Sequence, residues 1–208
     1  MTWLLFPRSS LMSNETPLLL REMNHRMADT LMVLVAILWE EFGRCAAPGV
    51  RESLGRCEAK IVAFGNLHRL LIVGARDTPI AVPSYVDSLC RALSEAVLQP
   101  LQVRCEVFAD EGFLPAEMCE RLGLVIAELV TNAARHAFNG HTDRVVRVEL
   151  ARTSKFWQCI VADNGTGIKA IQPGVGSRVL DELVRTLGGR SLLQSGPDGT
   201  SVTIVWSI

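Results

Sequence analysis

The sequence has little that would suit a disulfide scaffold, a zinc ribbon or a membrane span. Its six cysteines include no Cys-x-x-Cys pair, a distribution that argues against structural disulfides and zinc binding. We expect them to be reduced core residues. The apolar runs at 3–6 and 31–39 are too short for a secretory leader or a bilayer-crossing helix. We therefore expect a cytoplasmic protein with no direct membrane insertion.

An excess of charge of one sign is also missing. Lys and Arg number 21 against 22 Asp and Glu, which leaves a formal net charge of -1. Since no global basic field is available to attract nucleic acid, we expect no nucleic-acid partner. Hydrophobic residues make up 49% of the 208 positions, enough for the core of one large globular domain or two modest ones.

The front of the chain reads as a helical hairpin. Apolar residues recur with helical spacing over 18–42, and a second such stripe runs over 54–72 after a loop at 43–50 that contains Gly and Pro. Two antiparallel helices cannot bury these stripes alone, so we expect a homodimer that forms a four-helix bundle. We assign 18–78 to this all-α hairpin and 1–17 to an N-terminal tail.

The back of the chain, 79–208, alternates between helical and strand periods. This order predicts an α+β sandwich with its helices on one face of a sheet. The predicted helices span 82–98, 115–137 and 176–187, and the predicted strands span 101–109, 144–152, 156–163 and 200–207.

A polar cluster follows the strand at 156–163. The stretch VADNGTGI places Asp163 at the strand end, followed by Gly165 and Gly167, which allow close backbone approach. By itself this stretch is equally typical of an Asx-type turn.

Other polar positions accompany this stretch along the chain. On the predicted helix at 115–137, Glu128, Asn132, Arg135 and His136 share roughly one face. Downstream, Gly174 and Gly176 precede a helix, and free N–H groups at a helix start can bind an anion. A carboxylate for an aminopurine, an amide for a hydrated divalent cation and a glycine loop at a helix start together predict a nucleotide pocket.

The ordered motifs ELVTNAARHA, DNGTGI, GVGS and GT resemble the N, G1, G2 and final Gly-Thr motifs of the GHKL ATPase superfamily. The front half, with NHRMADTLMVLVAIL, is similar to the phosphoacceptor hairpin of the HisKA- and HWE-related histidine kinases. The chain departs from them at 28–30, which reads Ala-Asp-Thr where relatives have Lys-Asn-Asn, and its ATP lid, KAIQP, is very short.

The resemblance implies a role for each motif residue. It implies that His25 accepts phosphate, that Asn132 helps to hold Mg2+, and that Asp163 contacts adenine. It further implies that the motif glycines shape the ATP pocket and that Thr200 borders the base. Glu128 either polarises magnesium-bound water or orients Asn132. Arg135 either meets phosphate oxygens or lies on the solvated face of its helix.

His25 projects roughly 160° from the apolar stripe of its helix, at about 100° per residue. It therefore faces solvent or a docking partner, and Asp29, one turn later, shares its face and is placed to hydrogen-bond the imidazole. His68, in contrast, falls within the second apolar stripe, where a packed histidine is expected. His136 and His141 have no metal-ligand spacing to another His or Cys, so we expect no zinc.

Two functions fit this organisation. The first is a two-component histidine kinase that phosphorylates His25 from Mg-ATP and passes the phosphoryl group to a receiver-domain aspartate of a response regulator. The alternative is an ATP-independent phosphotransferase with a degenerate nucleotide domain. A non-kinase ATPase or serine kinase of the superfamily is disfavoured by the hairpin. The tail at 1–17 is too short for a sensor domain, so we expect the signal to come through a partner such as a separate sensor protein, or through the hairpin itself.

The predicted bundle can be tested through its apolar stripe. Replacing Leu31 or Leu34 by Ala should destabilise the dimer by about 2–5 kcal/mol, because each change leaves a cavity in the bundle core. Light scattering across a dilution series measures the assembly state. A wild-type chain that is a stable monomer at micromolar concentration would contradict the predicted bundle.

Overall fold

The computed structural model describes residues 48–71, 79–140, 142–168 and 175–208. The predicted helix at 18–42 lies outside these residues, so the structure describes only the second helix of the predicted hairpin and does not test the bundle. The helices of the described ranges are α2 (Pro48–Leu71), α3 (Val82–Leu93), α4 (Ala116–His136) and α5 (Val175–Thr186), with a short π-helix at Ser94–Leu98 (η1) and a 3-10 turn at Gln99–Leu101 (η2). Within these ranges, no helix combines the length and apolar character needed to cross a membrane.

A five-stranded sheet forms one layer of the domain, in the order β2-β4-β5-β7-β6. Strand β2 pairs in parallel with β4, and the other neighbours are antiparallel. The two short strands β1 and β3 form a separate antiparallel pair. The bounds are β1 (Ile80–Ala81), β2 (Arg104–Ala109), β3 (Phe113–Leu114), β4 (Val145–Arg152), β5 (Phe156–Asp163), β6 (Arg190–Gly196) and β7 (Gly199–Ser207).

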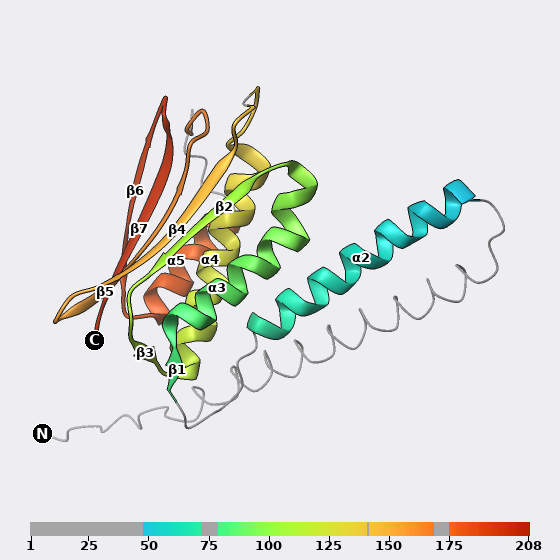
Figure 1. Ribbon diagram of the computed structural model, residues 1–208. Helices are drawn as coiled ribbons and strands as arrows, with labels where there is room; N and C mark the ends of the chain where they lie inside the picture. Colours follow the sequence, from blue (N-terminus) through green and yellow to red (C-terminus); the bar gives the residue numbers. More distant parts are fainter. Residues whose placement is uncertain (1–47, 72–78, 141, 169–174) are drawn as a thin grey trace, which may run out of the picture.

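Helices α3, α4 and α5 cover one face of this sheet (Figure 1). The strands alternate accordingly, and β7 turns Val202, Ile204 and Trp206 into the core while Val205 is exposed. The period of α4 produces a matching buried stripe, in which Leu122, Val125, Ile126 and Val130 are fully buried. The predicted α+β architecture with helices on one face is confirmed.

Several predicted elements differ from the structure in their bounds, and some strands have no predicted counterpart. Helix α2 already includes residues 48–50, which the sequence assigns to the loop at 43–50. Strand β6 was not predicted at all. Every residue of β6 is exposed, so the strand shows no apolar alternation, and its pairing with β7 holds it in the sheet.

Helix α2 contacts the domain only near its C-terminal end (Figure 1). Ala63 and Leu67 are buried there, Leu70 and Leu71 pack against the same core, and His68 is half-buried. Phe64 belongs to the predicted stripe but is 45% exposed, because it lies on a side of α2 that the described elements do not cover.

The cysteines of the described ranges are free thiols. Cys90, Cys119 and Cys159 are buried, in agreement with the expected core positions, whereas Cys57 is exposed and does not fit that expectation. Burial raises the pKa of the Cys159 thiol on β5 to about 12. This thiol therefore stays protonated and unreactive at neutral pH.

Helices α2, α3 and α4 meet closely at Gly123. A Cβ at this position would lie 2.2 Å from the Tyr85 hydroxyl oxygen and 3.1 Å from a methyl carbon of Leu71. The Tyr85 side chain is buried, and its hydroxyl donates a 2.7 Å hydrogen bond to the carbonyl of Cys119. Glycine at position 123 therefore leaves room for a tyrosine of α3 that is hydrogen-bonded to α4.

Gly123→Ala should destabilise the domain by about 1–3 kcal/mol, because the new methyl group displaces the Tyr85 hydroxyl from its buried hydrogen bond. Urea unfolding followed by circular dichroism measures this change. The same substitution in a Tyr85→Phe background should cost much less, since the clashing oxygen is gone.

Gly65→Ala in α2 is the matched control, because no atom of a neighbouring described element lies within 4 Å of a Cβ at that position. It should be neutral or stabilising by up to about 1 kcal/mol through helix propensity. Equal penalties for Gly123→Ala with and without the Tyr85 hydroxyl would show that the close approach is not the cause.

Candidate functional site

The polar face of α4 contributes one wall of the candidate site. Glu128 is half-buried, and Asn132, Arg135 and His136 are exposed. The Asn132 Nδ2 group donates a 3.0 Å hydrogen bond to Glu128 Oε1, one helical turn earlier. This contact turns the Asn132 amide oxygen away from Glu128.

Asp163 ends β5 on the side of the sheet that faces the helices. In the strand register it lies between Val146 of β4 and Thr200 of β7. Its Oδ1 accepts hydrogen bonds from the backbone N–H groups of Gly165, at 2.9 Å, and Thr200, at 3.2 Å. The first of these bonds is an Asx-type turn. The turn and the contact with Thr200 together fix the direction of the carboxylate.

The loop after Asp163 is bound to the end of α4. The Thr166 N–H donates a 2.9 Å hydrogen bond to the carbonyl of Ala137, the residue that follows α4. A Cβ at Gly165 would lie 2.2 Å from the same carbonyl oxygen. Glycine is therefore required at 165 for this backbone contact, which joins the end of β5 to the helix that carries Asn132.

The β6–β7 turn holds the other side of this loop. A Cβ at Gly167 would lie 2.1 Å from the carbonyl oxygen of Gly196. The Ser195 hydroxyl accepts a 2.7 Å hydrogen bond from the N–H of Ile168 and lies 3.0 Å from the Thr200 hydroxyl. Sequence reasoning missed Ser195 because it missed β6, and its only signal is its position five residues before Thr200.

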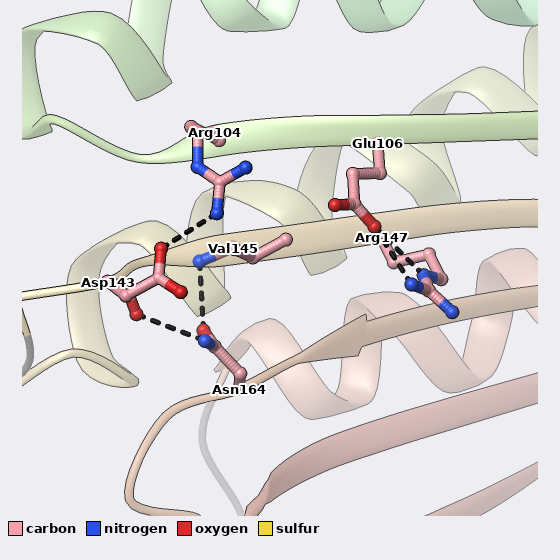
Figure 2. Close-up of polar contacts among 6 residues, drawn as sticks. All are labelled: Arg104, Glu106, Asp143, Val145, Arg147 and Asn164. Atoms are coloured by element: carbon pink, nitrogen blue, oxygen red, sulfur yellow. Dashed lines mark hydrogen bonds and ion pairs between the residues drawn. The ribbon is translucent and has the colours of Figure 1, made fainter.

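A second polar network lies at the same end of the sheet (Figure 2). Asn164 Oδ1 accepts a 2.8 Å hydrogen bond from the N–H of Val145, and its Nδ2 donates a 3.0 Å bond to the carbonyl of Asp143. Arg104 donates a 2.7 Å hydrogen bond to the Asp143 carboxylate, and this contact raises the pKa of the guanidinium. The sequence offered no signal for these contacts, which join residues 21 and 39 positions apart.

For some predicted residues the structure gives no position, or a position that differs from the prediction. His25, Asp29 and Gly174 lie outside the described residues, and so does His141. Gly176 lies within α5, whose described residues are Val175–Thr186, rather than before the helix as predicted. The described ranges contain no group of three or more His, Cys, Asp or Glu residues able to hold a metal ion.

Two family models match the chain. A model described as a histidine kinase-like ATPase domain matches residues 90–206, and one described as a histidine kinase matches residues 22–97. Since the first match alone covers more than half of the chain, the chain belongs to the histidine kinase family, as a core of the HisKA- and HWE-related type. The resemblance drawn from the ordered motifs is confirmed.

Sequence relatives agree with this assignment. The sensor histidine kinase PdtaS of Mycolicibacterium smegmatis is 25% identical over 150 residues, which cover 72% of this chain and 30% of that protein. Blue-light-activated histidine kinase 2 of Erythrobacter litoralis is 27% identical over 193 residues, which cover 89% of this chain and 56% of that protein. The chain thus spans less than two thirds of the length of either relative.

Solved structures share the fold. The histidine kinase domain of the Erythrobacter litoralis EL346 blue-light-activated kinase aligns with a TM-score of 0.60 and 24% identity, covering 84% of this chain and 95% of that one. A bacterial phosphotransferase aligns with a TM-score of 0.62 and 10% identity, covering 94% and 98%. At these identities the likeness concerns the fold alone.

The backbone contacts around Asp163 can be tested at Gly199. This residue has φ of +126°, and a Cβ on it would lie 1.9 Å from the Asp163 carbonyl oxygen. Gly199→Ala should destabilise the domain by about 3 kcal/mol or more, because it adds a backbone clash to an unfavourable conformation. Chemical denaturation measures the loss.

Gly196→Ala in the same turn is the control, since among the described residues no heavy atom beyond its chain neighbours lies within 4 Å of a Cβ at that position. Its effect should stay within about 0.5 kcal/mol, as for other surface changes. Similar losses for the two variants would contradict a specific contact between Gly199 and Asp163.

Proposed function

We propose that this chain is an ATP-dependent protein histidine kinase of a two-component system. A ring nitrogen of His25 forms a bond to the γ-phosphorus of Mg-ATP bound by the 79–208 domain as the bond to the departing ADP breaks, and the phosphoryl group then passes to an aspartate of a response-regulator receiver domain, which frees His25. The observation that carries the proposal is the Asp163 carboxylate, fixed at the end of β5 by Gly165 and Thr200 and joined through the Thr166 loop to the helix of Asn132.

Asp163 is the proposed adenine-binding residue. A carboxylate can accept more hydrogen bonds than the two that Oδ1 receives from the backbone, so it can also accept one from the exocyclic amine of adenine. Thr200 lies directly opposite Asp163 in the ladder, which supports its proposed place beside the base. Gly165 and Gly167 serve this site by bringing their loop against α4 and the β6–β7 turn.

Asn132 is the proposed metal-binding residue. Its amide oxygen, which points away from Glu128, is a hard oxygen donor of the type that Mg2+ prefers, so the residue present fits this ion. When bound, Mg2+ neutralises phosphate charge during transfer. The hydrogen bond from Asn132 to Glu128 supports the orienting role for Glu128 of the two that the sequence leaves open.

The phosphates are proposed to lie beyond the end of α4 and near the start of α5. Arg135 and His136, both exposed in the last turn of α4, are proposed to approach the phosphate oxygens as cationic or hydrogen-bonding groups. Gly174 and Gly176 flank the start of α5, where backbone N–H groups favour an anion.

The hairpin is proposed to present the acceptor. His25 takes the phosphoryl group as a neutral imidazole, with Asp29 holding its tautomer. We propose that two copies of the chain pair through their hairpins in a homodimer in the cytoplasm, and that a separate sensor protein supplies the signal. The domain boundary at 78–79 is part of this proposal.

A second candidate is an ATP-independent histidine phosphotransferase. Its support is the fold likeness to a bacterial phosphotransferase, which extends over 94% of this chain. In this alternative, His25 receives phosphate from one receiver domain and gives it to another, and the Asp163 site binds no nucleotide.

Incubation with γ-labelled Mg-ATP tests the proposal. The wild-type protein should acquire a label that is labile to acid and stable to base, as expected for phosphohistidine. His25→Gln should remove the label, whereas the control variant His68→Gln should retain it. A label that persists in His25→Gln and disappears in His68→Gln would move the acceptor to α2.

Asp163→Asn separates the two candidates. It should weaken ATP binding about ten- to a hundredfold, the loss of one charge-assisted hydrogen bond, while back-transfer from a phosphorylated receiver domain to His25 stays nearly intact. If the wild-type protein does not bind ATP at millimolar concentration but exchanges phosphate with a receiver domain, the kinase proposal is wrong and the phosphotransferase is favoured.

A further inference from the structure

Asn164 continues the sheet after the strand pairing ends. The ladder between β4 and β5 closes at the Val146–Asp163 pair. Beyond it, Asn164 makes three contacts with the chain just before and at the start of β4. Its backbone N–H donates to the Val145 carbonyl at 3.3 Å, and its side chain bonds to both the Val145 N–H and the Asp143 carbonyl. One half-buried amide thus takes the place of a further ladder step (Figure 2).

The segment to which Asn164 is hydrogen-bonded, residues 143–145, makes further hydrogen bonds of its own. Arg104 of β2 donates its side chain to the Asp143 carboxylate and its backbone N–H to the Arg144 carbonyl, at 2.7 and 2.8 Å. Arg144 in turn donates a 2.9 Å bond to the Leu101 carbonyl. Asn164, the residue after Asp163, is therefore bonded to the start of β4 through a segment that is itself anchored to β2 by Arg104.

The loop that follows Asp163 is also hydrogen-bonded to the first residue of the α4–β4 connection. Thr166 binds the Ala137 carbonyl at the end of α4, and Asn164 binds Asp143 and Val145 where β4 begins. Asp163 and Gly165 are the sequence neighbours of these two hydrogen-bonded residues. The main chain that directs the Asp163 carboxylate is thus fixed from both ends of one connection.

We infer that Asn164 is a positioning residue for adenine selection, because its amide locks the main chain that aims the Asp163 carboxylate. This inference rests on the proposed ATP-binding function. Asn164 need not touch the nucleotide. Without its amide, the carboxylate keeps its contacts with Gly165 and Thr200, but the main chain that follows it is no longer bonded to the start of β4, so the direction of the carboxylate is less tightly fixed. Discrimination for the 6-amino group of the purine then falls.

If Asn164 only stabilised the fold, the expected effects of its substitution would be different. Loss of a fold-stabilising contact would lower the unfolding midpoint, and it would change the affinity of the folded protein for all nucleotides alike or not at all. The informative quantity is therefore a ratio of dissociation constants, that of purine riboside triphosphate, which lacks the 6-amino group, over that of ATP. A fold-stability defect alone leaves this ratio unchanged.

The experiment measures this ratio by calorimetry for the full chain and its variants. The wild-type ratio should be about tenfold or more, the value of one hydrogen bond to a charged group. Asn164→Ala should reduce it to about threefold or less. Asn164→Asp keeps the acceptor for the Val145 N–H but loses the donor to the Asp143 carbonyl, so its ratio should fall between the two. Asn139→Ala is the matched control, because Asn139 is exposed in the same connection and should keep the wild-type ratio.

The outcomes separate this inference from the function on which it rests. A wild-type ratio retained in Asn164→Ala overturns the positioning role and leaves ATP binding intact. If Asn164→Ala does not unfold cooperatively, Asn164→Asp decides by the same criterion. A wild-type protein that binds both triphosphates equally also overturns the inference, since Asp163 then does not read the amino group. A wild-type protein that binds neither overturns the inference and the proposed kinase together.

Discussion

The candidate site depends on close contacts between main-chain segments at positions where no side chain separates them. At Gly165, Gly167 and Gly199, a single added carbon would lie about 2 Å from a carbonyl oxygen of another segment, well inside van der Waals contact. These approaches bring the end of α4, the end of β5 and the β6–β7 turn together around Asp163. The direction of that carboxylate, and with it the proposed adenine contact, follows from how closely three main chains can pack.

Much of this architecture could be predicted from local patterns. The helical period of 115–137 and the alternation of 200–207 reflect burial on one side, and both elements appear within a few residues of their predicted bounds. The acidic and amide positions of the site were also readable, because Asp163 and Asn132 stand in short motifs with a fixed order. Strand β6 could not be predicted, since all of its residues are exposed and its place in the sheet comes from pairing alone.

The contacts that organise the site were beyond sequence reasoning for a different reason. Asn164, Thr166 and Ser195 are ordinary turn residues, and each acts through a partner 19 to 29 residues away. Local propensity cannot distinguish an Asn that finishes a turn from one that replaces a ladder step on a neighbouring strand. The distinction requires knowing which strands are adjacent, and the sheet order β2-β4-β5-β7-β6 does not follow the chain.

That sheet order also has a consequence for synthesis. Strand β7, the last of the described strands, is inserted between β5 and β6, and Thr200 at its start completes the hydrogen bonds to Asp163. When synthesis has reached only β6, the place of β7 in the sheet is still empty. The edges of β5 and β6 that β7 will pair with are then both unpaired. The site therefore forms only once β7 has been made, and a nascent chain that still lacks β7 exposes unpaired strand edges that favour association with other chains.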